Sequence, residues 1–314
     1  MSSSSGFEEH SYGISISPSP QTSLPSNYLT PDLQDQETTI SVSTAFHPTA
    51  HPQFPPTDTL LVSADGVLFY VHSFVILKAS AFAFETTIGG PLDDPRFRNT
   101  VIPVPSVSPE LNVILHAVYD ISPANHSPTL QHLINAVDMM PNYSLPVGRL
   151  LHPDSSLFLY FMSIAPLHPM EIFVLAAHHE IHQLAVNTSA HLLSYPMHTI
   201  TDEQADRMGA AYLRRLLNLR LTRFTALKNI LLHAPLPHAP SRKCGFVEQR
   251  RLTRAWALAS AYIVWDSRLD LSTYSLQSSL EPLTEDVDCS ICKEILQARI
   301  DDVILRWTAV ERTI

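Results

Sequence analysis

Among the residues of the chain, three cysteines have the spacing that best suits a chemical role, either in metal binding or as a redox pair. Cys289 and Cys292 are separated by two residues, and this gap lets both thiolates reach one tetrahedral metal ion. Cys244 can join them if the intervening helices fold back, and a closed site then needs a fourth ligand such as His233 or His238. A structural zinc site, thiols without a ligand and a redox pair all stay open. Since no thioredoxin-like strand–helix–strand pattern surrounds the pair, we do not expect oxidoreductase activity.

A run of histidines at residues 178–182 suggests a second metal hypothesis. The run reads His-His-Glu-Ile-His, whereas the zinc-protease pattern requires His-Glu-x-x-His. His178 and His182 have the spacing that shares one helix face, but Glu180 points to another face and cannot serve as the general base. We therefore interpret this run as a partly exposed helix face.

No other spacing in the sequence indicates catalysis. The chain has no GxSxG motif for a serine nucleophile and no glycine-rich motif for phosphate binding. Adjacent carboxylates occur at Asp93-Asp94 and Asp301-Asp302, but neighbouring side chains diverge and seldom form an acid/base pair. We therefore predict no catalytic residue, no enzyme activity and no small-molecule substrate. A structural zinc ion is the one cofactor that we consider.

The composition is that of a globular protein from a reducing compartment. Hydrophobic residues make up 45% of the 314 residues and charged residues 16%. Three cysteines are too few to stabilise a secreted chain of this length through disulfide bonds, so we expect a cytoplasmic or nuclear location. The net charge of -10 argues against a nonspecific nucleic-acid binder.

Neither a signal peptide nor a membrane span is expected. The start of the chain is serine-rich and acidic and lacks the apolar core of a signal peptide. The apolar stretch at 157–177 is long enough to span a bilayer, but Pro166, Pro169 and Glu171 interrupt it. We predict two short buried helices there.

The secondary-structure signals predict an α+β fold behind a disordered tail. Residues 1–57 contain no Lys or Arg, carry five acids and are rich in Ser and Pro, so we predict a disordered acidic tail over residues 1–53. Turn residues and apolar periodicity then predict two strands, two short helices, a third strand and two further helices. We place these elements at residues 60–63, 67–71, 73–80, 81–88, 100–104, 108–119 and 130–140.

The second half of the chain shows helical periodicity only. We predict an all-helical extension over residues 146–314. Its expected helices cover residues 170–185, 190–193, 201–232, 248–266 and 289–313. The sequence from Thr201 to Gln204 is typical of a helix start, and Ser108 is expected to cap the helix that it opens.

One segment carries a resemblance to a known family. The pattern Phe54-x3-Asp58-x-Leu60-x2-Ser63-x-Asp65-Gly66-x2-Phe69-x-Val71-His72, followed by Ser80, resembles the opening of a BTB/POZ domain of the type common in basidiomycete fungi. The resemblance implies a compact α/β interaction module at residues 54–145. Its signature residues here are Asp58, Asp65, Gly66, Phe69, His72 and Ser80.

The resemblance also implies how the module works. Such modules form homodimers through an apolar face of the first strand and the helical hairpin, for which the candidates are Phe74, Ile76, Phe82 and Phe84. We expect Asp58 to accept backbone N–H groups and His72 to be a satisfied core histidine. Ser73 occupies a position that is usually basic in the family, which weakens the case for a charged peptide pocket beside Asp58.

Charge is unevenly distributed in the second half. Residues 207–254 contain eleven bases and one acid, whereas residues 281–311 contain eight acids and three bases. The basic helices could pair with the acidic C-terminal helix, form a solvated face, or bind an acidic partner protein. Nucleic acid is not expected, because the arginines alternate with leucines at core spacing.

Together with the resemblance, these observations predict a protein-interaction adaptor, and the resemblance implies that it forms a homodimer. By resemblance, the chain would bring a client protein to a cullin-type ubiquitin ligase. The alternative is a transcription-linked scaffold that does not itself bind DNA, and a metal-dependent enzyme is the outsider. Partner identification separates the first two functions, and metal analysis tests the third.

Overall fold

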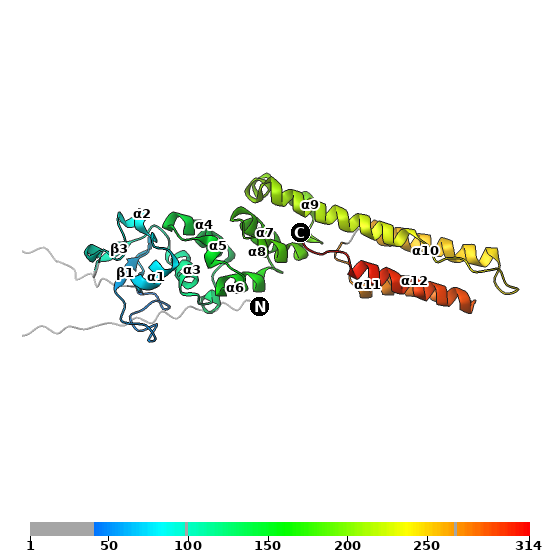
Figure 1. Ribbon diagram of the computed structural model, residues 1–314, viewed down its shortest axis with the longest axis horizontal. Coiled ribbons are helices and arrows are strands. Elements are labelled where there is room, and N and C mark those ends of the chain that lie inside the picture. Colours follow the sequence, from blue (N-terminus) through cyan, green and yellow to red (C-terminus); the bar gives the residue numbers. More distant parts are fainter. Residues whose placement is uncertain (1–40, 98–99, 267–268) are drawn as a thin grey trace, which may run out of the picture. The chain divides into compact units, whose positions relative to one another are not determined.

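The fold is α+β, with one small sheet and many helices (Figure 1). A computed structural model describes residues 41–97, 100–266 and 269–314. The sheet has the strand order β2-β1-β3. Strand β1 (Thr59–Val62) pairs with β2 (Leu68–Val71) in antiparallel and with β3 (Val101–Pro103) in parallel orientation. This confirms the predicted hairpin and third strand.

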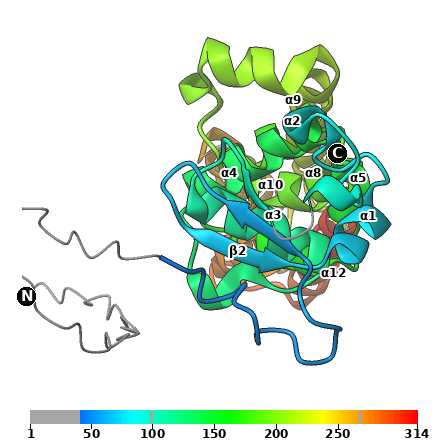
Figure 2. The ribbon, with the colours of Figure 1, turned by 90° about the vertical axis from the view of Figure 1, so that its left-hand side faces the viewer.

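Alternating side chains fix the register of the sheet. Leu61 lies opposite Phe69 on β2 and opposite Ile102 on β3, and all three side chains are buried. Gly66, in the turn between β1 and β2, has a φ of 82°, a conformation that glycine adopts without steric cost. Figure 2 shows the strands in the foreground with helices behind them. The sheet therefore covers one side of a helical core.

Part of the predicted tail belongs to this core. Residues 1–40 lie outside the described residues. Beyond them, the prediction of disorder up to residue 53 is wrong, because Val42 forms a bridge with Leu68 and the side chain of Phe46 is fully buried. The Phe46 carbonyl also accepts a hydrogen bond from the Tyr70 N–H group at 2.8 Å. Burial of one aromatic ring outweighs the polar composition of the segment around it.

The predicted helical hairpin is shorter than expected. Helix α1 (Ser73–Ala79) matches the prediction, but α2 covers only Glu85–Ile88. The reason is Phe84, which has a φ of 62° and donates its N–H group to the Tyr143 carbonyl at 2.9 Å. Its buried ring stacks on that of Tyr143 at a centroid distance of 4.6 Å. This tertiary contact interrupts the helix.

Helices α3 (Ser108–Tyr119) and α4 (Leu130–Met139) complete the predicted module. Short 3-10 helices occur at Pro95–Phe97, Pro123–His126 and Met140–Tyr143. The predicted cap of α3 is corrected by the structure: Ser108 is already helical, and Asp65 from the β1–β2 turn accepts its N–H at 2.8 Å and its hydroxyl at 2.6 Å. A side chain distant in sequence thus caps the helix.

Four helices follow α4. They are α5 (Val147–Leu150), α6 (Ser156–Ile164), α7 (Pro169–His178) and α8 (His182–Ser189). Helices α6 and α7 are the two short helices predicted in the apolar stretch. No helix in the described ranges has the length and apolar character that crossing a membrane requires.

The single helix predicted at residues 170–185 is in fact two helices. The chain turns between α7 and α8, where Glu180 has a φ of 56°. Periodicity alone continues through this break, because the residues on both sides are apolar at helical spacing. The predicted helix at 190–193 is a 3-10 turn at Ala190–Leu192. His178 and His182 therefore do not share a helix face.

Apart from 3-10 helices at Met197–Thr199 and Glu281–Thr284, the remaining described residues form four α-helices. They are α9 (Asp202–Leu232), α10 (Phe246–Asp266), α11 (Thr273–Leu280) and α12 (Ser290–Thr308). Thr201 and Gln204 form a capping box at the start of α9, as the sequence indicates. Gly209 interrupts α9 with a φ of 73°. Helix α11 was not predicted, since its serine-rich sequence has a weak helical signal.

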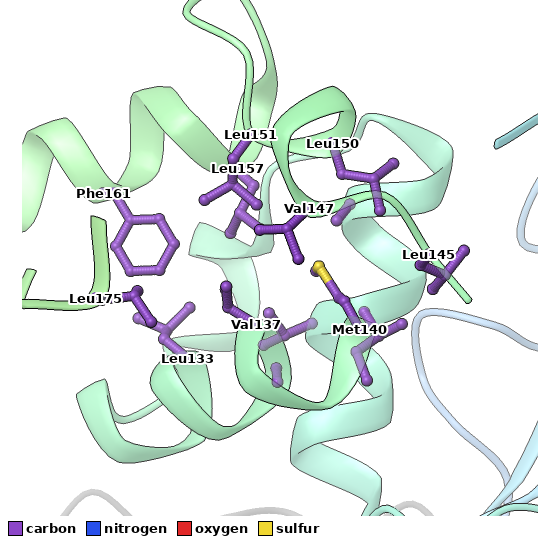
Figure 3. Close-up of a cluster of buried hydrophobic side chains, with 14 of the residues drawn as sticks. Leu133, Val137, Met140, Leu145, Val147, Leu150, Leu151, Leu157, Phe161 and Leu175 are labelled. Atoms are coloured by element: carbon purple, nitrogen blue, oxygen red, sulfur yellow. The ribbon is translucent and has the colours of Figure 1, made fainter. Parts of the chain in front are cut away.

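Two main buried cores share helix α9. The first extends from Phe46 to Leu216, and the second from Leu227 to Trp307. Figure 3 shows that side chains on both sides of residue 145, among them Val137 and Phe161, lie in one cluster. The first core thus continues past the predicted module boundary at residue 145.

Candidate functional site

The signature residue His72 is a structural core histidine. Its side chain is buried, and its Nε2 lies 2.9 Å from the Pro55 carbonyl oxygen. The Tyr119 hydroxyl lies 2.9 Å from Nδ1 and accepts the His72 backbone N–H at 2.8 Å. Since the carbonyl can only accept, Nε2 donates to it, and in the neutral ring Nδ1 accepts from the hydroxyl. All polar atoms of the ring are satisfied, as predicted.

Asp58 is used within the fold. Its carboxylate accepts the Ser73 N–H at 2.7 Å and the Ser73 hydroxyl at 2.5 Å, at the start of α1. Burial raises the pKa of this carboxyl, but the hydrogen bonds from Ser73 outweigh it and leave the pKa below its usual value. A cavity of about 40 Å³ beside it is lined also by Asp93. The two carboxylates make this depression acidic, and Ser73 supplies no positive charge but occupies the Asp58 carboxylate with hydrogen bonds.

The remaining signature residues are structural as well. Phe69 is buried in the sheet, and Asp65 and Gly66 form the turn that reaches α3. Ser80 ends α1, and its N–H donates to the Ile76 carbonyl at 3.1 Å. The segment at 54–88 thus builds a scaffold, and any binding would use its outer side chains.

The four interface candidates divide into two pairs. Ile76 and Phe84 are fully buried and cannot take part in an outer face, which corrects the prediction for these two. Phe74 is 46% exposed and Phe82 is 66% exposed. The ring of Phe74 packs edge-on against that of Phe54 at 5.7 Å. The exposed aromatic side chains of the helical hairpin are therefore Phe74, which packs against Phe54, and Phe82.

The structure brings the three cysteines together with one histidine. The Cys244 and Cys292 sulfurs are 3.6 Å apart, and the Cys289 sulfur lies 3.4 Å from Nε2 of His238. The ligand atoms of all four residues lie within 4.8 Å of one another. Of the two histidines considered from the sequence, His238 belongs to this group and His233 does not.

The environment of the thiols differs across this group. The backbone N–H of Cys292 is the main cause that lowers the pKa of Cys289 to about 7. Burial is the main cause that raises the pKa of Cys292 to about 12. Cys289 precedes α12, where N–H groups without helical partners point towards it, whereas Cys292 is buried on the first turn.

One histidine of the run at 178–182 contacts the carboxylate of an ion pair. His179 Nε2 lies 2.7 Å from the Asp138 carboxylate, which Arg207 also contacts at 2.6 Å. His178 could add a third ligand atom to Asp138 and His179, but this carboxylate already has its partners. His182 lies apart from them, with its Nδ1 3.3 Å from Nη1 of Arg215.

The basic stretch has two different environments. In α9, Arg207 pairs with Asp138, while Arg223 is buried and donates to backbone carbonyls that follow α12. Among the described residues, no arginine of α9 or α10 forms an ion pair with an acid of α12. The structure therefore contradicts one of the alternatives from the sequence, in which the basic helices pair by charge with the acidic C-terminal helix.

Sequence reasoning missed a surface on α10. Trp256, Ser260 and Ile263 form the buried face of this helix. At 100° per residue, six exposed residues lie on the opposite side. We call them the α10 stripe: Val247, Arg251, Arg254, Leu258, Tyr262 and Trp265. The signal in the sequence was the helical spacing of apolar residues on the same side as arginines.

Comparison of the chain with protein-family models, with curated proteins and with solved structures gave no match. The functional reading therefore depends on the surfaces and the side-chain groups described above.

Proposed function

We propose that the chain is a protein-interaction adaptor that binds a partner protein through the α10 stripe. The observation that carries this proposal is the exposure of large apolar side chains beside arginines on the solvent side of one helix, with Leu258 74% exposed. Tyr, Trp and Arg are the residue types that contribute most to binding energy at protein interfaces. Single exposed apolar residues are common, but a run of them along one helix face is typical of an interaction site.

Charge complementarity indicates the chemistry of the partner. Arg251 and Arg254 lie within the stripe, and residues 207–254 carry eleven bases and one acid. The partner that fits presents an apolar groove for Leu258 and Tyr262, rimmed by carboxylates. The resemblance of residues 54–88 to a BTB/POZ opening makes subunits of cullin-type ubiquitin ligases the first candidates to test.

The experiment starts from partners captured by the full chain and identified by mass spectrometry. Binding of each purified partner is then measured by calorimetry for three variants. Leu258→Ser should weaken binding at least about 10-fold, the effect of an interface anchor. Leu305→Ser is the matched control, because Leu305 is 71% exposed on a different helix, α12, and should leave binding unchanged.

A charge-reversal variant tests the second half of the proposal. Arg251→Glu combined with Arg254→Glu should slow association and reduce its dependence on salt. A partner that binds both Leu258→Ser and the charge-reversal variant as well as it binds the natural chain would overturn the proposed surface. Chain-to-chain binding that these variants abolish would assign the stripe to a second copy instead.

We further propose that the module of residues 54–145 binds a second copy of the chain. The exposed parts of Phe74 and Phe82 amount to roughly 200 Å² per copy, given the ~150–250 Å² that an aromatic side chain can bury. A stable dimer needs roughly 600–1,000 Å² per partner, so further exposed apolar side chains of the module, such as the half-exposed Val101 on β3, must contribute. The two rings are then anchors within a larger face.

Light scattering at several concentrations tests this second surface. The chain should behave as a dimer, and Phe74→Ser combined with Phe82→Ser should convert it to a monomer with unchanged circular dichroism. A monomer at every concentration, before any substitution, would refute self-association.

A further inference from the structure

The geometry of one side-chain group matches that of a structural metal ion. In a tetrahedral zinc site, metal–sulfur and metal–nitrogen distances of about 2.3 and 2.05 Å place two sulfurs about 3.8 Å apart, and a sulfur and a nitrogen about 3.6 Å apart. The corresponding separations here are 3.6 Å for Cys244–Cys292 and 3.4 Å for Cys289–His238. We propose that His238, Cys244, Cys289 and Cys292 bind one Zn²⁺ ion.

A disulfide does not explain the arrangement. Bonded sulfurs lie about 2.05 Å apart, and all three cysteines are free thiols. The short sulfur–sulfur contact joins Cys244 to Cys292, 48 residues apart, rather than the two members of the CxxC pair. Three thiols and one imidazole that converge from two separate segments form a ligand set typical of structural zinc.

The histidine is oriented for metal binding. Nδ1 of His238 lies 2.7 Å from the Ala239 carbonyl oxygen, which can only accept a hydrogen bond. The proton is therefore on Nδ1, and the Nε2 lone pair faces the Cys289 sulfur. Metal-binding histidines usually donate their other ring N–H group to a carbonyl or carboxylate in this way.

The backbone holds the cysteines in position. Cys244 donates its N–H to the Ser241 hydroxyl at 3.1 Å, and the Ser241 N–H donates to the Cys244 carbonyl at 2.8 Å. Cys289 directly precedes α12, and Cys292 lies on its first turn, so both thiols are placed by the start of one 19-residue helix. N–H groups at a helix start stabilise the negative charge that thiolate ligands carry.

Four protein ligands define the type of site. A catalytic zinc keeps one coordination position open for water, whereas four side chains fill a tetrahedral ion. The ion would join the loop at residues 233–245 to the start of α12, next to the second core. Figure 1 shows this loop and the first turn of α12 at the same end of the helical group. The ion would therefore stabilise the packing of α9 and α10 on α12.

The test measures zinc in the purified full chain and then its affinity for added Zn²⁺. We expect one zinc per chain, and a chelator should lower the unfolding temperature. His238→Ala and Cys289→Ser change residues at the rim of the core and should each weaken zinc binding at least about 100-fold. His233→Ala is the matched control, an exposed histidine on the same loop that lies outside the ligand group.

Two further measurements keep the test independent of folding. Co²⁺ added to the chelated chain should give the absorption bands of tetrahedral thiolate coordination, lost in Cys289→Ser and retained in His233→Ala. Thiol titration of the denatured protein should find three free thiols. A folded chain that contains no zinc and takes up neither Zn²⁺ nor Co²⁺ would overturn the proposal, as would a Cys289–Cys292 disulfide.

Discussion

Replacing Arg223 with methionine should destabilise the second core by about 2–4 kcal/mol. The Arg223 side chain is only 2% exposed. Its Nε donates to the Leu269 carbonyl at 3.0 Å, and its Nη1 donates to the Val310 and Glu311 carbonyls at 2.8 and 2.7 Å. The guanidinium also stacks on Trp307, 4.3 Å from the ring centroid. One cation thus joins α9 to the segments that follow α10 and α12.

The magnitude follows from what each partner loses. The Leu269 carbonyl is buried, and an unpaired buried acceptor costs about 1–3 kcal/mol. The other two carbonyls are partly exposed and can bind water, so each loses about 0.5–1.5 kcal/mol, and the stacking contributes about 0.5–2 kcal/mol. The substitution also removes a cost of the natural chain, because burial disfavours the charged guanidinium and lowers the pKa of Arg223 to about 10. The net loss of stability is therefore smaller than this sum.

Urea unfolding followed by tryptophan fluorescence measures this change where it occurs. All three tryptophans of the chain, Trp256, Trp265 and Trp307, lie in α10 and α12. Arg214→Met, at an exposed position of α9, is the control and should change stability by less than about 0.5 kcal/mol. If Arg223→Met is as stable as this control, the buried hydrogen bonds carry no net stability and the reasoning fails.

Three further predictions concern the first core. Burial lowers the pKa of His116 from 6.5 to about 4, so the unfolded chain binds a proton at a higher pH than the folded chain does. The free energy of unfolding should therefore fall by about 3 kcal/mol as the pH drops from 6.5 to 4. His116→Gln should flatten that part of a pH–stability profile. Gly209→Ala should cost about 1–2 kcal/mol in thermal unfolding because of its φ of 73°, whereas Gly148→Ala, in helix α5, should be neutral or stabilising. Asp65→Ala removes both acceptors for Ser108 and should cost about 1–2 kcal/mol by urea titration; no loss would show that water replaces this cap.

The sequence predicted those elements whose conformation depends mainly on residues that are close together in the chain. The Asp65-Gly66 turn requires a positive φ, and the alternation of Leu61 and Phe69 with less buried residues fixes a strand pair. The capping residues Thr201 and Gln204 satisfy the first N–H groups of α9 from within the same turn. For these elements, neighbours in sequence supply most of the required contacts.

Tertiary contacts decided the elements that the sequence did not predict. The ring of Phe46 packs in a core built by residues distant in sequence, and this orders the polar segment around it. Phe84 interrupts the predicted helix, because its ring and its N–H group contact Tyr143. Glu180 breaks a continuous apolar pattern where α7 packs beside α8. No periodicity within a short window contains this information.

The candidate metal group shows the same limit. The CxxC spacing predicted that two thiols could meet, because both lie on one turn. The choice of His238 over His233 depends on how the proline-rich loop returns towards α12, which the sequence left open. Leu258 and Tyr262 have the spacing of one helix face, but only the structure shows that this face of α10 is exposed and that the opposite face is buried.

The continuity of the first core across residue 145 has a practical consequence for dissecting the chain. A recombinant fragment that stops there would keep Leu133 and Val137 but lose Phe161 and Leu175, which cover them (Figure 3). Such a truncated fragment would expose a large apolar surface to solvent and would aggregate or bind chaperones. Fragments intended for isolated study should therefore retain the chain at least through Leu216.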